Sequence, residues 1–515
     1  MSLDKKEYFY ITTPIYYIND EPHIGHFYCT TAADILARYH RLIGDEVYFV
    51  TGTDENSQKT IQAAEKAGME PQKFTDIMAE KWKNTWKKLN ISFDFFIRTT
   101  LPEHKKSVEK LLMKCYENGD IYKKEYEGWY CVGCEKFLMD SELVDGKCPV
   151  HKTEPQWLKE ENYFFRLSKY ENKLKELMER KEFALPESRR NEMKEFIRQG
   201  LQDISISRAT VKWGIPMPID KSQVVYVWFD ALINYITALG YYEDNEKMKK
   251  FWHNAIHLVG KDIFRFHTIM WPAMLISAGL PPPKQVFGHG FFTINGEKIS
   301  KSLGNVIDPV QLAEKYGIDS IRYFIMREIP FGKDSDFSIK RLEERYKGDL
   351  ADDLGNLLNR SINMLIKYTN GKIPAPDTKF HNGDVKNLNL QNNGEKLVQL
   401  IENNYKNFEF SQMLEALWEY IKSVNKYIDD MKPWNLKKEN KTSELNTVLY
   451  NIMQSLNFIA LFLYPVMPET ASKIYSQIGI EKDILKENYQ DKTKWGSLKP
   501  GNIVKKGEIL FPPLR

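Results

Sequence analysis

The sequence predicts an α/β catalytic domain of Rossmann type, with a parallel sheet split by an insertion, followed by an all-α helical bundle. Three observations support this fold class. Strand-like and helix-like segments alternate near the N-terminus, a turn-rich stretch with clustered cysteines interrupts them, and helical periodicity fills the last third of the chain. Such alternation is typical of parallel sheets covered by helices. A length of 515 residues suits about two to four domains of the usual size.

The first elements alternate between the two types. Residues Tyr8–Ile18 are aromatic and β-branched and stop at a turn, which predicts a buried strand. His26–Leu42 then shows helical periodicity and ends at Gly44. A second strand is predicted at Val47–Val50 and a second helix at Thr60–Ala67. This order opens a parallel α/β sheet.

The alternation breaks after about residue 115. Residues 125–161 are rich in turn formers and carry the clustered cysteines, and two short helices are expected at Lys169–Arg180 and Ser188–Arg198. Strands are expected again at Val224–Phe229, Ile256–Val259 and Val286–Phe287. We infer one sheet domain interrupted by an insertion of about 100 residues.

Helical periodicity dominates from about residue 349. Leucine and isoleucine recur at the spacing of one helix face between Leu354 and Leu365. Similar runs cover Glu395–Asn403, Met413–Tyr427 and Leu445–Leu463, while residues 371–393 are loop-like, so a bundle of four or more helices is expected. The predicted boundaries are 1–115 for the first half of the catalytic domain, 116–222 for the insertion, 223–310 for the second half, 311–348 for a stem-contact linker region and 349–515 for the bundle.

Composition excludes several classes of protein. Apolar residues make up 42% and charged residues 28% of the chain, which is globular rather than disordered or collagen-like. The longest apolar stretch, near Leu456–Met467, is too short for a membrane span, and the charged N-terminus does not resemble a secretory signal. The net charge of +3 means that any nucleic acid binds through local patches. Five cysteines are too few for a disulfide scaffold, so we expect a reduced, cytoplasmic protein with Cys29 and Cys115 buried as apolar residues.

The first candidate site is His23-Ile24-Gly25-His26, where the first strand gives way to the first helix. Nucleotides bind at the carboxyl edge of a parallel sheet, and a helix N-terminus favours phosphate. Gly25 allows a ligand to approach the backbone closely. His23 and His26 can donate hydrogen bonds to phosphate oxygens as charge builds up. Taken alone, the pair could equally be two hydrogen-bonded surface or helix-cap histidines.

The second candidate site is the KISKS segment Lys298–Ser302, which follows a turn at Asn295-Gly296. Lysines among serines suit a polyphosphate or a departing pyrophosphate, although most such runs are solvated basic loops. An early HIGH and a late KISKS on a split α/β sheet together resemble the class I aminoacyl-tRNA synthetases, in which the two signatures frame the ATP site. A P-loop NTPase is excluded, because no Gly-Lys pair is followed by Ser or Thr.

A cysteine and histidine cluster indicates a metal. Cys131 and Cys134 form one close pair, and Cys148 and His151 form another. Two such pairs across a loop match a tetrahedral structural zinc site, and nothing nearby suggests an open catalytic position. The alternative is three free thiols and a surface histidine, which would leave a loop of about 35 residues with little to hold it together.

A closer resemblance runs from about Tyr8 to the end of the chain. It is carried, in this order, by TTPIYYIN, PHIGH, TGTDE, YEGWYCVGC, DISISR, WGIPMP, YVWFDALINY, GKDIFRFH and KISKSLGN. Together these segments resemble the methionyl-tRNA synthetases, in a short form with a single zinc knuckle. The resemblance implies ATP-dependent attachment of L-methionine to tRNA(Met) through methionyl-adenylate, with Mg²⁺ accompanying ATP.

The resemblance also implies a methionine pocket. Asp54, at a strand end, matches the carboxylate that holds the amino group. An apolar slot with aromatic walls suits a thioether, because sulfur contacts rings well. Without the resemblance, Trp228 and Tyr235 would be assigned to the core. The other matching positions are Ile15, Tyr17, Trp228, Ala231, Leu232, Tyr235, Ile263 and His267.

The remaining site residues are carried over in the same way. Lys301 resembles the lysine that neutralises the departing pyrophosphate, and Asp262 could accept from ribose hydroxyls. Asn356, Arg360 and Trp434 match the readers of the anticodon, although from the sequence alone they would be a helix-surface pair and a core tryptophan. The implied ATP site is His23, Gly25, His26, Gly260, Asp262, Lys298 and Lys301, with His23, His26, Lys298 and Lys301 catalytic.

The chain departs from the family's pattern in places. Asn56 stands where relatives often have His, which leaves its role open. KISKS replaces KMSKS, an apolar exchange that should be tolerated. We expect no further tRNA-binding module after Leu510–Pro513, and because that module supports dimers in relatives, we expect a monomer.

Three alternatives remain at this point. Another class I synthetase, for leucine, isoleucine, valine or cysteine, is disfavoured because the insertion is small and the cysteine cluster lies about 105 residues after HIGH. A non-catalytic tRNA-binding or RNA-chaperone module would not need intact HIGH and KISKS segments. A small nucleotidyltransferase would not need a C-terminal bundle of about 165 residues.

Overall fold

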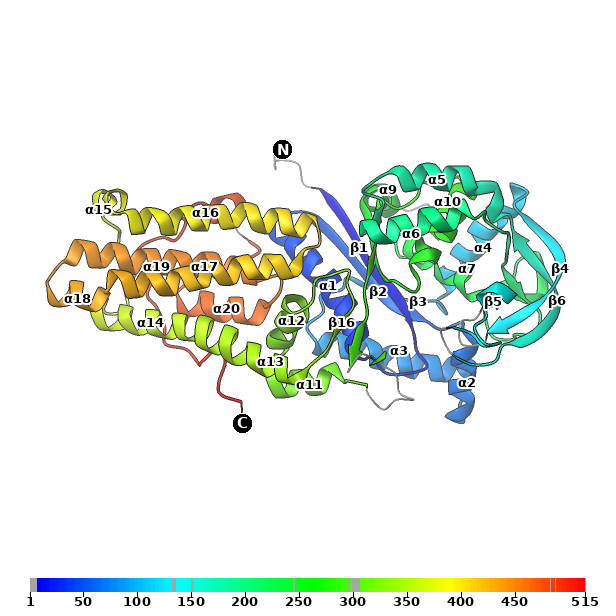
Figure 1. The fold of residues 1–515 in the computed structure, drawn as a ribbon, viewed down its shortest axis with the longest axis horizontal. Helices are drawn as coiled ribbons and strands as arrows, with labels where there is room; N and C mark the ends of the chain where they lie inside the picture. Colours follow the sequence, from blue (N-terminus) through cyan, green and yellow to red (C-terminus); the bar gives the residue numbers. More distant parts are fainter. Residues whose placement is uncertain are drawn as a thin grey trace. The chain divides into compact units, whose positions relative to one another are not determined.

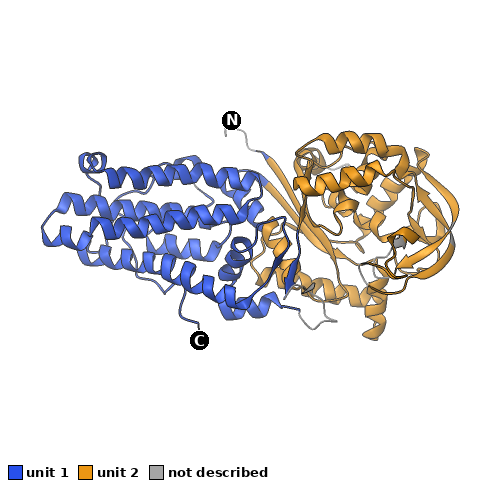
Figure 2. Ribbon diagram, in the orientation of Figure 1, with its two compact units in different colours: residues 1–7, 34–46, 290–515 blue, residues 8–33, 47–289 orange. Residues whose placement is uncertain are grey.

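The computed structural model describes residues 7–131, 136–149, 152–243, 246–294, 297–298, 306–481, 483–486 and 488–514. The chain divides into two compact units, which Figure 2 distinguishes by colour. The first comprises residues 1–7, 34–46 and 290–515, and the second comprises residues 8–33 and 47–289. Each unit is described by itself.

The main sheet is parallel, as the Rossmann-type prediction requires. Within the described residues it has six strands in the order β3-β2-β1-β12-β13-β7, and the pairs β2–β3, β1–β12, β12–β13 and β13–β7 are parallel. Figure 1 labels the first three of them, β1, β2 and β3. The chain adds β2 and β3 on one side of β1, then β12 and β13 on the other. The sheet therefore changes direction between β1 and β12, where nucleotides bind in such sheets. The strands are β1 Tyr8–Tyr17, β2 Glu46–Asp54, β3 Phe95–Arg98, β7 Ala184–Leu185, β12 Ala255–Gly260 and β13 Gln285–His289.

Helices pack against this sheet and enclose the core of the second unit. Trp82, Trp86 and Trp271 are fully buried there, and Cys29 and Cys115 are buried as expected. The helices are α1 Ile24–Leu42, α2 Gln58–Lys66, α3 Pro71–Lys88, α4 Pro102–Glu117, α9 Glu246–Phe251 and α10 Trp271–Ser277, with short turns η3 Tyr241–Glu243 and η4 Trp252–Asn254 and the π-helix η5 Phe266–Met270.

The insertion contains a long antiparallel ribbon at both ends of the region that was expected to be rich in turns, so that expectation was wrong for 125–131 and 156–161, whereas residues 139–149 and 152–155 carry turns and bends. Trp129 lies opposite Trp157 in the ribbon. Its charged residues hid the strand pattern, because a ribbon with one solvated face tolerates them. The sheet has the order β5-β4-β6-β8. The elements are β4 Ile121–Cys131, β5 Lys136–Leu138, β6 Gln156–Phe165, β8 Ile204–Ser205, α5 Glu171–Glu179 and α6 Glu187–Arg198, with turns η1 Asp140–Glu142 and η2 Leu167–Tyr170.

The strand expected at Val224–Phe229 is also corrected. The strand there is β11 Asp220–Val225, which pairs antiparallel with β9 Ser207–Arg208 and β10 Pro216–Met217 outside the main sheet. Short helices follow directly, α7 Val227–Ala231 and α8 Asn234–Thr237. A short apolar run does not by itself distinguish a strand from a buried helix.

The C-terminal part of the first unit is helical, as predicted. Helix α19 is buried all round and packs against α14, α16, α17 and α20. The expected loop at 371–393 instead contains α15 and the start of α16, each begun by an aspartate whose carboxylate accepts backbone N–H groups. The elements are α11 Pro309–Tyr316, α12 Ile318–Arg327, α13 Ile339–Arg345, π-helix η7 Tyr346–Gly355, α14 Asn356–Thr369, α15 Thr378–Gly383, α16 Val385–Lys406, α17 Phe410–Met431, α18 Pro433–Lys438, α19 Thr442–Leu463, α20 Pro468–Gln477 and α21 Tyr489–Lys492, with strands β14 Phe292–Ile294, β15 Glu297–Lys298 and β16 Ser335–Asp336.

A buried arginine joins three parts of this unit. Arg322 on α12 has no exposed side-chain surface, and its Nη2 donates to Asp34 Oδ2 at 2.6 Å. Its Nε donates to the carbonyl of Val466 at 2.7 Å. Because a buried charge is tolerated only when it is paired and hydrogen-bonded, these contacts fix the second half of α1 against the bundle. Among the described residues, none of the helices is long and apolar enough to cross a membrane.

Candidate active site

The HIGH segment lies at the carboxyl end of β1, where the sheet changes direction. The N–H of Phe27 donates to the His23 carbonyl at 3.1 Å, so His23 immediately precedes helix α1. The two imidazole rings, His23 and His26, stack with centroids 3.7 Å apart. The two rings therefore lie against each other at the start of helix α1, an arrangement that the sequence pattern did not predict.

Backbone groups hold both rings in one tautomer. The N–H of Gly25 donates to His23 Nδ1 at 3.1 Å, and the N–H of His23 donates to His26 Nδ1 at 3.2 Å. Burial, and then the neighbouring His23, lower the pKa of His26 well below its usual value. A neutral ring that accepts at Nδ1 carries its proton on Nε2. Both histidines can therefore offer an Nε2–H donor.

The glycine between them has a steric reason. A Cβ built on Gly25 would lie 3.0 Å from Cε1 and 3.2 Å from Nδ1 of His23. Any side chain there would push the His23 ring away from the backbone N–H that orients it. Glycine at this position thus lets the His23 ring lie close to the backbone of the helix start.

A buried polar network lies beside Asp54, the residue predicted to hold the amino group. Asp54 ends β2 and is 4% exposed, and the N–H of Asn56 lies 3.4 Å from its Oδ1. The Asn56 amide donates to Asp230 Oδ2 at 2.7 Å, and His104 Nε2 lies 2.6 Å from Asp230 Oδ1. Sequence reasoning missed Asp230 and His104, although an aspartate inside the apolar run VYVWFDALINY was a usable signal.

The other end of the predicted methionine pocket is a buried polar pair. The His267 ring is 2% exposed, and its burial lowers the pKa of His267 to about 4. His267 Nδ1 lies 2.9 Å from the Ile263 carbonyl, so this nitrogen carries the proton and donates. Nε2 then accepts from the Tyr235 hydroxyl at 2.7 Å. The pair forms a neutral polar edge in an otherwise apolar wall.

The remaining pocket residues surround this edge. The ring of Trp228 stacks on Phe266 with centroids 4.1 Å apart and meets His267 edge-on at 6.4 Å. Phe266 was not among the predicted residues. The predicted residues Ala231, Leu232 and Tyr235 are buried, whereas Ile15, Tyr17, Trp228 and Ile263 are half-buried and pack against the core.

The predicted nucleotide contacts lie at the end of β12 and in the KISKS segment. Gly260 ends β12 and is buried, and Asp262 follows in the exposed turn. The backbone of Lys298 pairs with Thr293 in the β14–β15 hairpin. The side chain of Lys298 and all of Lys301 lie outside what the structure describes.

Two of the four predicted zinc ligands are described. Cys131 ends β4 and Cys148 follows η1, and both are 1% exposed in one small buried cluster with Leu138. Cys134 and His151 lie outside the described residues.

The predicted anticodon residues belong to the helical bundle of the first unit. Asn356 is exposed at the start of α14, and Arg360 Nη2 donates to Asp429 Oδ1 at 2.7 Å. Asp429 lies near the end of α17, just before α18, which carries Trp434. The Trp434 side chain is 42% exposed, unlike a core tryptophan.

Comparison with known proteins agrees with this geometry. The family model described as tRNA synthetases class I (M) matches residues 9–157 and 142–362, and the anticodon-binding domain of tRNA ligase matches residues 392–510. The methionine–tRNA ligase of Caldanaerobacter subterraneus subsp. tengcongensis is 51% identical and covers 98% of this chain and 79% of the relative. The methionine–tRNA ligase of Thermotoga maritima is 49% identical and covers 98% of this chain and 80% of the relative.

A solved structure matches over the whole fold. Methionyl-tRNA synthetase of Mycobacterium tuberculosis in complex with methionyl-adenylate has a TM-score of 0.93 and 38% identity, covering 98% of this chain and 100% of that chain. The split parallel sheet, the histidine pair at its switch point and the helical bundle define a class I tRNA synthetase. The chain belongs to the methionyl-tRNA synthetase family of that class.

Proposed function

We propose that this chain attaches L-methionine to tRNA(Met) with ATP, through methionyl-adenylate, and that the residues described above carry the chemistry. The observation that supports the residue assignment is the juxtaposition of two features in one unit. The paired histidines offer Nε2–H donors at the carboxyl end of β1. The Tyr235–His267 pair, on α8 and η5 of the same unit, forms the neutral polar edge of the proposed methionine site.

Methionine would bind first between Asp54 and the Tyr235–His267 pair. The buried Asp54 carboxylate attracts the ammonium group, and Trp228 supplies an aromatic wall for the thioether. Because His267 stays neutral, the slot presents no charge to an uncharged side chain. A leucine, which has a different shape but similar size, gains nothing from the polar edge.

Adenylate formation follows as an in-line displacement. The methionine carboxylate attacks the α-phosphate of ATP, and pyrophosphate leaves. The His23 and His26 Nε2–H groups donate to phosphate oxygens on which charge accumulates. We assign Gly25, Gly260 and Asp262 to ATP binding, and Lys298 and Lys301 to the departing pyrophosphate. Mg²⁺ bound with ATP supplies further neutralisation of phosphate charge.

Transfer to the tRNA completes the reaction. A hydroxyl of the 3′-terminal ribose attacks the acyl carbonyl, the bond to AMP breaks, and AMP leaves with the electron pair. No covalent bond to the enzyme is needed, so no nucleophilic serine or cysteine is required. In the bundle, Trp434 would stack on an unpaired anticodon base, while Asn356 and Arg360 would bond to base edges.

We assign one structural zinc to Cys131, Cys134, Cys148 and His151. The two described ligands fit this role, because both cysteines are buried in one small cluster where β4 ends. When bound, the metal would hold this loop in place of an apolar core. Clustered thiols that bind metal are typical of a reducing compartment, which supports a cytoplasmic enzyme.

The test of this function is ATP–pyrophosphate exchange without tRNA, against each amino acid in turn. Exchange with methionine alone is expected. Exchange with another amino acid would overturn the pocket assignment while leaving the class I chemistry intact. Absence of exchange in folded, metal-loaded protein would overturn the adenylation mechanism.

A further inference from the structure

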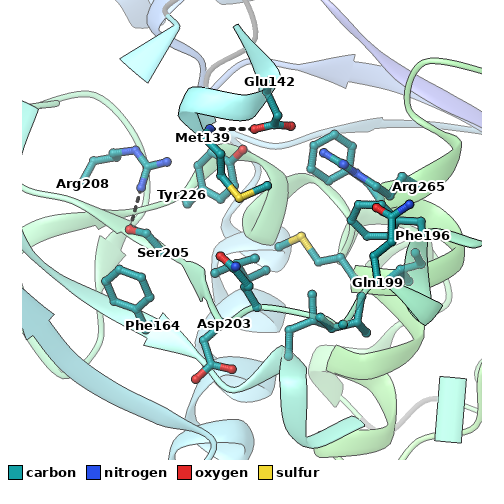
Figure 3. A pocket seen from close by; sticks show the side chains of 18 residues that line it. Met139, Glu142, Phe164, Phe196, Gln199, Asp203, Ser205, Arg208, Tyr226 and Arg265 are labelled. Atoms are coloured by element: carbon teal, nitrogen blue, oxygen red, sulfur yellow. Dashed lines mark hydrogen bonds between the residues drawn. The ribbon is translucent and has the colours of Figure 1, made fainter. Parts of the chain in front are cut away.

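A pocket lies beside the residues proposed to bind methionine, in the same unit. Its volume is about 350 Å³, within the usual range for small-ligand sites. Figure 3 shows side chains from the insertion, from helix α6 and from η5 converging on it. The proposed mechanism gives this pocket no role.

Each side of the pocket carries an arginine stacked on an aromatic ring. The Arg265 guanidinium lies 4.7 Å from the centre of the Phe196 ring, and the Arg208 guanidinium lies 4.3 Å from that of Tyr226 (Figure 3). Arg208 is 5% exposed and is fixed by hydrogen bonds from its Nη1 to Ser205 Oγ at 3.0 Å and the Ser207 carbonyl at 2.7 Å. On one side of the pocket the charge of Arg208 is held in place by hydrogen bonds, and on the other side Arg265 carries the more accessible charge.

The acidic side chains of the pocket are already engaged. Asp203 accepts from Tyr122 at 2.9 Å and from the Ser168 hydroxyl at 2.6 Å, and Glu142 accepts from the backbone of Met139 at 2.9 Å. Among the described residues, no ion pair joins Arg265 to a carboxylate. The pocket thus combines aromatic surfaces with two arginines and two carboxylates, and the carboxylates are held by neutral donors rather than by Arg265.

The position of the pocket connects it to the reaction. Phe266 contributes to its lining and also stacks on Trp228 of the methionine slot. Arg265 and His267 flank Phe266 in the chain, so one short segment contributes both to the pocket and to the proposed methionine site. A ligand in this pocket would lie against the wall that carries the aminoacyl group.

We propose that this pocket takes an unpaired base and its phosphate from the 3′ end of the tRNA, next to the terminal nucleotide. This inference rests on the proposed function, because it needs a tRNA substrate. Single-stranded nucleic acid is bound by bases stacked on aromatic rings or guanidinium planes, with cations on the backbone. The half-buried Phe196 supplies the ring and Arg265 supplies the cation, while the buried Tyr226 and Arg208 form the opposite wall.

Other small ligands fit less well. A second methionine would not use two stacked guanidinium groups, and the triphosphate of ATP is assigned to the HIGH and KISKS segments. A nucleotide of the acceptor end uses both the flat apolar surfaces and the positive charge. Bound here, it would direct the following ribose toward the acyl carbonyl.

The experiment separates the two chemical steps. In Arg265→Gln and Phe196→Leu, the single-turnover transfer of methionine from preformed enzyme-bound adenylate to tRNA should slow about tenfold each. ATP–pyrophosphate exchange without tRNA should stay within about twofold of the parent enzyme. The proposed function fails if the parent shows no exchange, whereas the pocket assignment fails if exchange is normal and transfer is unchanged in both variants.

Matched variants control for charge and packing. Arg198 lies on α6, the helix that carries Phe196; its side chain is 76% exposed and paired with Glu195. Arg198→Gln should therefore leave transfer unchanged. Phe196→Tyr keeps the ring and should transfer at nearly the parental rate. Equal losses of exchange and transfer in Arg265→Gln would show that the pocket only supports the methionine slot, and would overturn the proposal.

A direct probe of stacking completes the test. A tRNA with 2-aminopurine in place of the nucleotide before the terminal adenosine should lose fluorescence on binding the parent enzyme. Phe196→Leu should bind this tRNA with a much smaller loss. Equal quenching by the two proteins would overturn the assignment of Phe196 to a base.

Discussion

The carboxamide of Asn56 donates a 2.7 Å hydrogen bond to Asp230, 174 residues further along the chain. The bond joins the loop after Asp54 to the helix that carries Trp228. Asp230 is fully buried and its other oxygen contacts His104. Two parts of the proposed methionine site that are distant in sequence are therefore held together by one buried carboxylate.

Replacing Asn56 with alanine should weaken methionine binding. The KM for methionine should rise about tenfold, because a buried carboxylate loses a charge-assisted partner worth about 1.5–3 kcal/mol. Asn56→His restores a donor at the position where relatives often have histidine, and should recover most of the loss. Steady-state exchange kinetics over a range of methionine concentrations would measure this, and an unchanged KM in Asn56→Ala would contradict it.

Replacing His23 with alanine should slow adenylation without weakening methionine binding. The ring supplies a donor to the phosphates, and removal of one such donor costs about 10²–10³-fold in rate. Pre-steady-state measurement of adenylate formation gives the rate, and equilibrium dialysis gives the affinity for methionine. A parallel fall in both quantities would show that His23 is structural. Asparagine at the same position, which keeps a donor, is the matched control.

Stability should depend on the neutrality of His267 at mildly acid pH. Its folded pKa of about 4 lies below the unfolded value, so the unfolded state binds more protons between these two values. The free energy of unfolding therefore falls as the pH drops from ~6.5 toward ~4, because protonation of His267 favours the unfolded state. The total loss from this group is about 3 kcal/mol. Urea unfolding at pH 7 and pH 5 should show a smaller drop for His267→Gln than for the parent. Identical drops would contradict the assignment.

Removal of the metal should loosen the insertion before it affects the rest of the chain. Chelation or Cys148→Ser should remove one zinc per chain and lower the melting temperature, because the cluster around Cys131 and Leu138 is too small to fold alone. Metal analysis with thermal melting would measure both effects. Serine at Cys29, which is buried in the core of the sheet domain, should lower stability without loss of zinc. A parent protein without zinc would refute the site.

Alanine at Arg360 or Trp434 should raise the KM for tRNA by about tenfold and leave tRNA-free exchange unchanged. The half-exposed Trp434 has a matched control in Trp157, which is 53% exposed in the other unit. Aminoacylation kinetics over a range of tRNA concentrations would give the KM for tRNA of Trp434→Ala and of the control Trp157→Ala. Equal effects of Trp157→Ala and Trp434→Ala would argue against anticodon reading by Trp434.

Sequence reasoning succeeded where a local pattern carried the structure. The strand at Tyr8–Tyr17, helix α1 and helix α19 were predicted because their apolar patterns are long and their ends are marked. The stacked geometry of His23 and His26 was not predicted. It depends on hydrogen bonds from backbone N–H groups to the rings, and such bonds leave no pattern in the sequence.

Prediction failed where distant residues decide the structure. Asp230, His104 and Asn56 are neighbours only in three dimensions, so their network has no signature in one sequence. The strand expected at Val224–Phe229 was wrong after Val225, because its short apolar run fits a buried helix equally well. Lys301, Cys134 and His151 lie outside the described residues, and their roles stay predictions.

Through the short strand β7, the insertion is also part of the main sheet. Ala184 and Leu185 come from the inserted segment, yet they pair with β13 and form the outer strand of the main sheet. Excision of the insertion would strip β13 of this neighbour and leave a row of unpaired backbone groups, the kind of edge that recruits other chains into aggregates. The two halves of the catalytic domain and the segment between them are therefore interwoven, and the segment could not be exchanged between relatives as a detachable cassette.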